Sequence, residues 1–278
     1  EMKKKVFKII GNPISHSLSP ALHTYWFNKY KISADYKQHE IKESEIEVTL
    51  NDVRDGKIDG LNVTLPFKQK VIPYLDILIN DARSTNSVNT IFMSKEGKLT
   101  GDNTDVYGMQ AAYLKDITLN SNRSTKAIVI GAGGVAPSII FALKKTNIKK
   151  VCIANRTHEK AIFMKKKFPF IDILNFKEVP QRISEFDIII NATSLGLKNG
   201  EQFNVNLDDL TDKSIFIDTI YNPLETKIIK HLKGKNIKTF NGLDMLIYQG
   251  QKSFYIWNKI NPEIDDELIQ LLENRIKC

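Results

Sequence analysis

The chain has 278 residues, enough for two domains, and its 42% hydrophobic and 26% charged residues are typical of an ordinary globular enzyme. No apolar stretch approaches the roughly 18 residues that a membrane-spanning helix needs, so we expect no transmembrane segment and no membrane partner. The formal charge of +8 comes from scattered lysines without interleaved aromatic residues, so we expect no nucleic-acid partner, although this positive field would attract anionic ligands.

The first third of the chain predicts strands separated by helices. After three lysines, an apolar run that is too short for a signal peptide predicts a first strand over 6–10. Leu22, Trp26 and Phe27 share one helical face and predict a helix over 20–30. Further short apolar runs predict strands at 34–39, 60–64 and 88–92. Strands that alternate with helices are typical of βαβ units and a mostly parallel sheet.

The middle of the chain predicts a second set of strands, buried on both faces. Continuous apolar runs of this kind lie at 127–130, 150–154, 187–190 and 214–218. A glycine-rich segment and a helix with Ile139, Ile140 and Leu143 follow the first of these strands, and another helix is predicted from about Glu159. This βαβαβ succession is typical of a dinucleotide-binding, Rossmann-like domain.

From Met245 onward the chain predicts helices that are too short to form a domain, so we expect them to pack back on the first domain. The predicted fold class is therefore α/β, with an N-terminal α/β substrate domain, a Rossmann-like domain and returning C-terminal helices. The expected ranges are 1–104 for the substrate domain, 105–243 for the Rossmann-like domain and 244–278 for the C-terminal helices.

Cysteine usage predicts a reducing environment. The chain has two cysteines, Cys152 in a predicted buried strand and Cys278 at the end, which cannot supply a disulfide framework. We therefore expect a cytoplasmic protein. We also expect no metal site, and a monomer or a homodimer.

The glycine-rich segment lies where a dinucleotide-binding loop is required, after a buried strand and before a helix. Its residues are Gly131, Ala132, Gly133, Gly134, Val135 and Ala136. Glycines permit a tight turn and a close approach of the backbone to a pyrophosphate, whose charge the helix N-terminus stabilises. The alternative is a turn with a structural role alone.

The end of the next strand distinguishes NADP from NAD. An NAD site usually has an acidic residue there that binds the ribose hydroxyls, but this chain has Asn155. The planar fork of Arg156 matches a 2′-phosphate, Thr157 offers a hydroxyl group, and Lys160 adds a positive charge. Basic residues at a helix start oppose the helix dipole unless a phosphate neutralises them. The sequence therefore predicts NADP as the cofactor.

Three polar clusters are not explained by packing. Ser15, Ser17 and Ser19 follow the first strand, at the edge where a parallel sheet places its ligand sites. Serine there can also cap the following helix, which is the interpretation that we adopt for Ser19. Residues 62–68 put two polar side chains on one face of a strand, followed by a lysine, and residues 101–105 gather acids and amides at a predicted turn. Any one of these clusters alone is more often a loop than a site.

Together the clusters resemble the shikimate dehydrogenase family, and the resemblance covers nearly the whole chain. The similar motifs of the first domain are GNPISHS at 11–17, NVT with Pro66 and Lys68 at 62–68, VNT at 88–90 and NTD at 103–105. Those of the remainder are NATSLG at 191–196, Asp218 with Tyr221 and Pro223, and GLDML with Gln249 from Gly242. The resemblance implies an NADP-dependent dehydrogenase that reversibly reduces 3-dehydroshikimate to shikimate. Its partners would be these small molecules, and its role would lie in the shikimate pathway to chorismate and the aromatic amino acids.

On this resemblance Lys68 and Asp105 form the catalytic pair. The ketone oxygen of the substrate needs a proton when hydride arrives from the nicotinamide, and Lys68 would donate that proton or accept it in reverse. Asp105 would orient the Lys68 ammonium group and bind a neighbouring hydroxyl. The alternative is a salt bridge that ties the two domains together.

The resemblance also implies residues that bind the substrate and the nicotinamide. Ser15 and Ser17 would bind the carboxylate. Hydrogen bonds around the ring are implied for Asn62, Thr64, Asn89, Tyr221 and Gln249. The nicotinamide side would be lined by Thr193, Ser194, Ile220, Gly242 and Met245. Such polar groups would select the substrate, because leaving one of them unpaired is costly.

One position departs from the family pattern. The family usually has Gly-Ala before Val-Asn-Thr, whereas this chain has Asn86 and Ser87. Asn tolerates a positive φ better than other non-glycine residues, so the turn can survive the change. Whether Asn89 shifts stays open at this point.

Two alternatives stay open as well. A broader quinate or shikimate dehydrogenase would also use NAD, which the missing acid near Asn155 argues against. A non-catalytic sensor would keep the pocket to bind a metabolite, but binding alone requires no proton donor such as Lys68.

Overall fold

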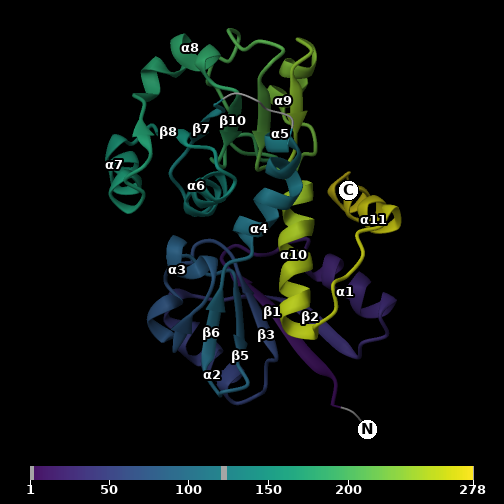
Figure 1. The fold of residues 1–278 in the computed structure, drawn as a ribbon. Coiled ribbons are helices and arrows are strands. Elements are labelled where there is room, and N and C mark those ends of the chain that lie inside the picture. Colours follow the sequence, from purple (N-terminus) through teal and green to yellow (C-terminus); the bar gives the residue numbers. More distant parts are fainter. Residues whose placement is uncertain (1–2, 120–123, 278) are drawn as a thin grey trace. The chain divides into compact units, whose positions relative to one another are not determined.

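The computed structural model describes residues 3–119 and 124–277, so Cys278 lies outside the described residues. The chain divides into two compact units, the first comprising the residues up to Val106 together with Ile247–Arg275, and the second comprising Tyr107–Leu246 together with the residues from Ile276 on. Each unit contains a six-stranded sheet with helices (Figure 1), which confirms the predicted α/β fold class. Within the described ranges, no helix has the length and apolar character to cross a membrane.

The sheet of the first unit is mixed. Its strands are β1 (Lys5–Gly11), β2 (Ala34–Glu40), β3 (Gly60–Val63), β4 (Ile77–Leu78), β5 (Thr90–Met93) and β6 (Leu99–Asp102), in the order β2-β1-β3-β5-β6-β4. β1 pairs in parallel with β2 and β3, but β5 runs antiparallel to β3 and β6. The connection between β5 and β6 is a short turn closed by Ser94 and Lys98, too short for a parallel crossover. The predicted mostly parallel sheet is therefore correct around β1 and wrong around β5.

Strand β6 also corrects the prediction of a turn at residues 101–105. Gly101 and Asp102 pair with β5 as the last residues of β6, and the turn begins at Asn103. The Asp102 carboxylate accepts hydrogen bonds from Asn80 Nδ2 at 3.1 Å and from the Asn103 N–H at 2.7 Å. The sequence did not predict that this strand includes Gly101 and Asp102, because glycine and aspartate are both rare in strands.

Helices pack on both faces of the first sheet. The helices of this unit are α1 (Ser19–Lys29), α2 (Ile46–Arg54), the short α3 (Asp81–Thr85), α10 (Leu243–Asn258) from Ile247 on, and α11 (Asp266–Lys277) up to Arg275. On one face, Leu50 and Val53 of α2 belong to a core with Leu61 of β3. On the other face, the predicted apolar stripe of α1 is buried, and Phe27 stacks on Phe7 of β1 with ring centroids 5.3 Å apart. The part of α10 from Ile247 on lies against this second face (Figure 1).

The second unit has an entirely parallel sheet. Its strands are β7 (Lys126–Ile130), β8 (Lys150–Ala154), β9 (Asp172–Ile173), β10 (Ile188–Asn191), β11 (Ile215–Asp218) and β12 (Lys238–Phe240), in the order β12-β11-β10-β7-β8-β9. The chain moves outward from β7 to β9, then returns to β10 on the other side of β7. The strand order therefore reverses between β7 and β10, and open parallel sheets bind ligands at the carboxyl ends of the strands at such a point.

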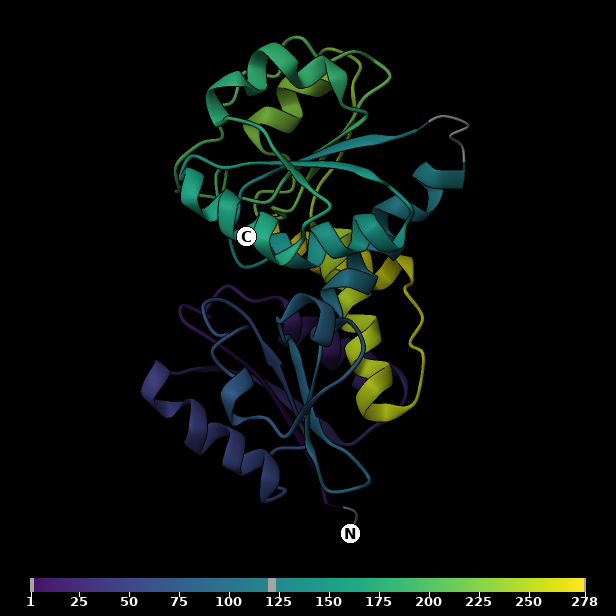
Figure 2. The same ribbon diagram turned by 60° about the vertical axis from the view of Figure 1, so that its left-hand side comes forward.

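Helices cover both faces of the second sheet (Figure 2). The unit contains α4 (Asp105–Met109), which begins at the end of the first unit, α5 (Lys115–Leu119), α6 (Ala136–Lys145), α7 (His158–Lys167), α8 (Val179–Arg182) and α9 (Lys227–Lys233). α8 and α9 share one core with β7, β10 and β11, whereas α6 and α7 lie on the other face. The predicted dinucleotide-binding succession of strands and helices is present.

Candidate active site

Lys68 and Asp105 form a buried ion pair in the first unit. Lys68 Nζ lies 2.7 Å from Asp105 Oδ2, and the two side chains are 14% and 8% exposed. The Lys68 carbonyl accepts the Val88 N–H at 2.8 Å, and Asn103 Oδ1 accepts the Asp105 N–H at 2.9 Å, so both backbones are fixed. Both residues belong to the first unit, so the pair does not tie two domains together. The low exposure of the two side chains makes their attraction stronger than that of an ion pair on the surface.

Asn89 connects Asp105 to Gln249. Its Nδ2 lies 3.3 Å from Asp105 Oδ1, 3.3 Å from Gln249 Oε1 and 2.7 Å from Thr104 Oγ1. Its Oδ1 accepts the Thr104 N–H at 2.8 Å. The structure thus brings Lys68, Asn89, Asp105 and Gln249 into one buried polar cluster, as motif resemblance implied. An amide nitrogen has two hydrogens for these three acceptors, so they share its donors.

A second layer of polar groups lies behind Asn89. Asn62 Oδ1 accepts the Tyr36 hydroxyl at 2.6 Å, and Asn62 Nδ2 donates to the Asn89 carbonyl at 3.0 Å and to Ser253 Oγ at 3.2 Å. The fully buried Ser253 hydroxyl also lies 2.8 Å from Thr90 Oγ1. Asn62 is therefore engaged at both ends of its amide by the protein itself, and its position supports Asn89.

Sequence reasoning missed Tyr36, Thr90 and Ser253. A signal for Ser253 existed, because it follows Gln249 by four residues and so lies on the same face of α10. Thr90 belongs to the VNT motif at 88–90 but received no role of its own, and Tyr36 carried no signal because tyrosine is ordinary in a strand.

The loop after β1 presents Ser15 and Ser17. A Cβ atom on Gly11 would lie 2.5 Å from Thr64 Cγ2, so only glycine lets the ends of β1 and β3 approach this closely. Gln38 Nε2 donates to the carbonyls of Ser15 and Ser17, at 3.1 and 3.3 Å, and holds the loop. Ser15 is exposed, Ser17 is half-buried, and Thr64 is half-buried at the end of β3. The remaining implied ligand, Tyr221, belongs to the second unit, in the loop after β11.

The prediction that Ser19 caps α1 is wrong. Ser19 is the first residue of the helix, and Leu18 occupies the cap position without a side-chain hydrogen bond. The Ser17 hydroxyl oxygen accepts the Ser19 N–H at 3.2 Å instead, because it precedes the first turn and can reach this amide. Ser17 therefore has a structural contact besides its implied role.

Asn86 adopts the left-handed conformation, with φ of 49°, so the turn survives the departure from the family pattern. Asn89 is anchored on both sides, since its carbonyl accepts the Val63 N–H at 2.8 Å and its N–H donates to the Asp102 carbonyl at 3.1 Å. Asn89 therefore keeps its place in the cluster. Ser87 is buried, and within the described ranges its hydroxyl has no hydrogen-bond partner.

The glycine-rich loop of the second unit lies at the point where the strand order reverses. Gly131 follows β7 with φ of +112°, and a Cβ there would lie 2.8 Å from Thr193 Cγ2 in the loop after β10. A Cβ on Gly133 would meet no described atom within 4 Å, so the backbone there is open to an approaching group. α6 begins at Ala136 with no side-chain cap and no acidic residue in its first turn. An uncapped helix N-terminus of this kind suits a pyrophosphate.

Asn155 joins this loop to the basic turn after β8. Its Oδ1 accepts the Ala132 N–H at 3.1 Å and its Nδ2 donates to the Thr157 carbonyl at 2.9 Å. An amide can make both bonds, whereas an ionised carboxylate could not donate the second. Arg156, Thr157 and Lys160 are exposed on the turn and the first residues of α7. The structure also places Glu201 beside Arg156, with Glu201 Oε1 3.2 Å from Arg156 Nη1, and the sequence did not indicate this ion pair.

A buried carboxylate organises the loops after β10 and β11. Asp218 Oδ1 accepts from Asn191 Nδ2 and from the Ile220 N–H, both at 3.1 Å, and its Oδ2 accepts the Thr226 hydroxyl at 2.9 Å. Asn191 Oδ1 in turn accepts the Thr193 hydroxyl at 2.6 Å. This chain of bonds positions Thr193 and Ile220, and the Ile220 carbonyl accepts the Gly242 N–H at 2.9 Å.

Ser194 follows Thr193 in the same loop, and the Met245 N–H donates to the Tyr113 hydroxyl at 3.3 Å. The second unit thus holds all five residues implied for the nicotinamide side.

We expect Asp218→Asn to change how stability depends on pH. Burial raises the pKa of Asp218 to about 6, from an ordinary value of 3.8. The folded state then holds this proton where the unfolded state has lost it, so the free energy of unfolding falls as pH rises from about 4 to 6, by about 3 kcal/mol at most. In Asp218→Asn this part of the fall should be absent.

Urea unfolding at a series of pH values measures the effect, with Asp209→Asn, an exposed carboxylate of the same unit, as the control. Parallel pH profiles for the wild type and Asp218→Asn would contradict the prediction.

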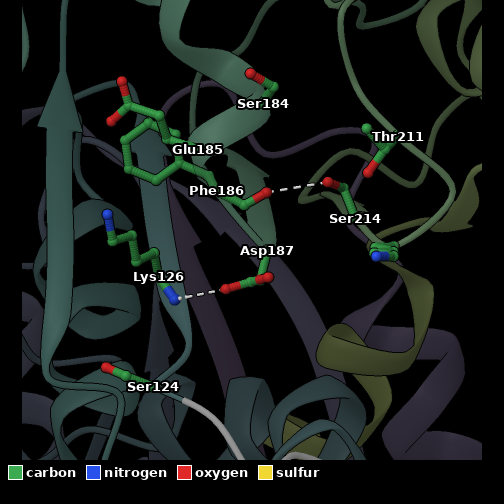
Figure 3. A pocket seen from close by; sticks show the side chains of 9 residues that line it. Ser124, Lys126, Ser184, Glu185, Phe186, Asp187, Thr211 and Ser214 are labelled. Atoms are coloured by element: carbon green, nitrogen blue, oxygen red, sulfur yellow. Dashed lines mark hydrogen bonds between the residues drawn. The ribbon is translucent and has the colours of Figure 1, made fainter.

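A polar pocket of about 360 Å³ lies at the opposite, amino ends of the strands in the second unit. Figure 3 shows two pairs in it that connect neighbouring strands, the Lys126 N–H to Asp187 Oδ2 at 3.0 Å and the Ser214 hydroxyl to the Phe186 carbonyl at 3.0 Å. The pocket is therefore distinct from the glycine-rich loop, and its polar groups join the starts of β7, β10 and β11. Over residues 3–119 and 124–277, no group of three or more His, Cys, Asp or Glu side chains is placed to bind a metal ion.

Comparison with known proteins decides the family. Residues 9–91 match the family model described as shikimate dehydrogenase substrate binding domain, and residues 114–235 match the one described as shikimate / quinate 5-dehydrogenase. A shikimate dehydrogenase (NADP(+)) of Pelagibacter ubique is 48% identical over 270 residues, which cover 97% of this chain and 99% of the relative. The chain belongs to the shikimate dehydrogenase family.

Solved structures of shikimate dehydrogenases agree with this assignment. A crystal structure of shikimate dehydrogenase in complex with NADP+ is 33% identical, with a TM-score of 0.87 over 100% of this chain and 96% of the other. Shikimate 5-dehydrogenase from Listeria monocytogenes, in complex with shikimate and NAD, is 29% identical, with a TM-score of 0.86 over 97% of this chain and 96% of the other. The family membership predicted from seven motifs is confirmed.

Proposed function

We propose that this shikimate dehydrogenase family member reduces 3-dehydroshikimate to shikimate with NADPH, reversibly. The observation that carries the proposal is the buried Lys68–Asp105 pair beside Asn89 and Gln249, an ammonium group among hydrogen-bonding groups suited to a polyhydroxylated ring. The enzyme class and the cofactor NADP, both predicted from the sequence, are confirmed by the relatives. The activity implies a role in the shikimate pathway to chorismate and the aromatic amino acids.

The first unit would bind the substrate. Ser15 and Ser17 lie on a loop whose backbone is held by Gln38, and their hydroxyl groups are proposed to bind the substrate carboxylate. Asn89, Asp105 and Gln249 are proposed to bind ring hydroxyls, because their polar side chains gather beside Lys68 in one cluster. Thr64 at the end of β3 and Tyr221 of the second unit are proposed as further ligands, whereas Asn62 acts by holding Asn89.

Lys68 would move the proton. NADPH, when bound, supplies the hydride that reduces the substrate ketone at its carbon. Lys68 Nζ–H donates a proton to the ketone oxygen, which becomes the new hydroxyl group, and accepts it back in the reverse direction. Asp105 Oδ2 accepts a hydrogen bond from Lys68 Nζ at 2.7 Å and so orients the ammonium group toward that oxygen.

The second unit would hold NADP. Gly133 leaves space beside the uncapped start of α6 for the pyrophosphate, Gly131 to Val135 form the loop, and Arg156, Thr157 and Lys160 form the surface for the 2′-phosphate. Thr193, Ser194, Ile220, Gly242 and Met245 are proposed for the nicotinamide side. The low cysteine content fits a reducing compartment such as the cytoplasm, which we propose as the location. The assembly is proposed to be a monomer or a homodimer, which light scattering would distinguish.

Rates of NADPH oxidation with 3-dehydroshikimate and with 3-dehydroquinate test the proposal directly. We expect turnover with the first substrate and a much lower rate with the second. Preference for 3-dehydroquinate would overturn the substrate assignment. Absence of turnover with both, while shikimate still binds, would favour a metabolite sensor.

Arg156→Ala should raise the Michaelis constant for NADPH by about tenfold or more, the scale of one lost charged hydrogen bond, and leave that for NADH nearly unchanged. Only NADPH has the 2′-phosphate that the guanidinium fork would bind. Arg182→Ala is the matched control, since Arg182 is another exposed arginine of the second unit in an ion pair, with Glu185. Equal losses for both cofactors would show that Arg156 does not read the phosphate.

A further inference from the structure

Glu201 lies against the guanidinium group that the proposed function assigns to the 2′-phosphate. Arg156 Nη1 is 3.2 Å from Glu201 Oε1 and Arg156 Nη2 is 3.4 Å from Glu201 Oε2, so two N–H groups face the two oxygens of one carboxylate. The two side chains are 56% and 63% exposed. The pair joins residues 45 positions apart in the sequence, both in the second unit.

The backbone of the loop after β10 brings Glu201 to this place. The Gly196 N–H donates to the Glu201 carbonyl at 2.7 Å, which closes a loop of six residues. Within it the Gly200 N–H donates to the Leu197 carbonyl at 2.9 Å, and the Lys198 N–H donates to the Asn222 carbonyl at 3.1 Å. Thr193 and Ser194, which are proposed for the nicotinamide side, lie just before this six-residue loop, in the same connection after β10. Glu201 is thus held beside Arg156 by its backbone as well as by the ion pair.

We propose that Glu201 is a specificity-determining residue that weakens the preference of this enzyme for NADP over NAD. The inference rests on the proposed role of Arg156. The guanidinium fork presents one pair of N–H groups in this direction, and a carboxylate and a phosphate are alternative partners for it. A 2′-phosphate that binds this edge of the guanidinium group must displace Glu201, and one that binds another edge still has the negative charge of Glu201 nearby.

An unphosphorylated ribose meets neither obstacle. A carboxylate at this point can accept hydrogen bonds from ribose hydroxyls, as the acid of an NAD site does. The acid that is missing after β8, where Asn155 stands, is thus supplied by a residue distant in the sequence. Arg156 and Glu201 would then act in opposite directions on the choice of cofactor.

The expected size of the effect follows from the exposure of the pair. Exposed ion pairs are weak, so a phosphate, which carries nearly two negative charges, can displace the carboxylate. Glu201→Gln keeps the size of the side chain and removes the charge. It should tighten binding of a 2′-phosphorylated ligand by about two- to fivefold, the range that corresponds to one exposed ion pair.

Equilibrium binding by calorimetry tests the proposal with two probes that differ by the 2′-phosphate alone, adenosine 2′,5′-bisphosphate and adenosine 5′-monophosphate. The proteins are the wild type, Glu201→Gln, Arg156→Ala and the double variant, with Glu185→Gln as control because Glu185 forms a similar exposed pair with Arg182. Glu201→Gln should bind the bisphosphate more tightly and the monophosphate no more tightly. The gain should disappear in the Arg156→Ala background, since the competition is for Arg156.

Two outcomes would overturn the inference and separate it from the proposed function. Unchanged or weaker bisphosphate binding by Glu201→Gln, with the expected loss in Arg156→Ala, would remove the role of Glu201 and keep the phosphate site. Unchanged bisphosphate binding by Arg156→Ala would remove both Arg156 and Glu201 from the phosphate site, and NADPH oxidation would still report whether the enzyme assignment holds.

Discussion

Lys68→Ala should lower the turnover of 3-dehydroshikimate by about a hundredfold or more, the usual scale for the loss of a general acid or base. In the wild type, Lys68 Nζ contacts Asp105 Oδ2 at 2.7 Å. The variant lacks this ammonium group, so the ketone oxygen of the substrate has no proton donor when hydride arrives. The Michaelis constant for the substrate should change much less, because Asn89 and Gln249 remain. Steady-state kinetics in both directions measure the two effects.

The control is Lys70→Ala, two residues further on, where an exposed lysine pairs with Glu43 at 2.6 Å. Removing Lys68 leaves the buried Asp105 without its cation, so the variant should be less stable than the wild type. The contact of Asn89 Nδ2 with Asp105 Oδ1 at 3.3 Å remains, and we expect the variant still to fold. A circular dichroism spectrum and a melting curve establish this before the kinetics are compared. Normal turnover in a folded Lys68→Ala protein would mean that the proton comes from another group.

Replacing Ser15 and Ser17 together with alanine should raise the Michaelis constant for shikimate by about tenfold or more for each lost bond, since a hydrogen bond to a charged group contributes about 1.5–3 kcal/mol. The exposed Ser15 hydroxyl has no hydrogen-bond partner within the described ranges, so its loss should leave stability unchanged. Turnover at saturation should fall less, because the reacting groups stay in place.

Ser17 needs a separate measurement because its hydroxyl oxygen accepts the Ser19 N–H at 3.2 Å. Loss of a bond at a helix start costs roughly 0.5–2 kcal/mol, so the single variant Ser17→Ala should melt slightly earlier, whereas Ser15→Ala should not. Melting temperatures and shikimate kinetics on both single variants and the double variant separate stability from binding. A lower melting temperature with an unchanged Michaelis constant would place the carboxylate elsewhere.

The features that the sequence determined by itself are those encoded over short distances. The strand before Gly131, the helix after it and the basic turn at Arg156 follow one another within about one βαβ unit, and periodicity and glycine placement specify such units locally. The burial of Trp26 and Phe27 in α1 follows from the same reasoning. The pairing of Lys68 with Asp105, 37 positions apart, could be expected through family resemblance and not through spacing.

The remaining features depended on the tertiary structure. β5 runs antiparallel because the next turn is short, and β6 formed although its composition resembles a turn. Tyr36 and Ser253 meet around Asn62, and Glu201 meets Arg156, through sheet order and loop closure. Each of these residues is ordinary in its own segment. Side chains far apart in the chain become neighbours only when strand order and loop geometry are decided, and a local pattern of hydrophobic and polar residues does not encode that choice.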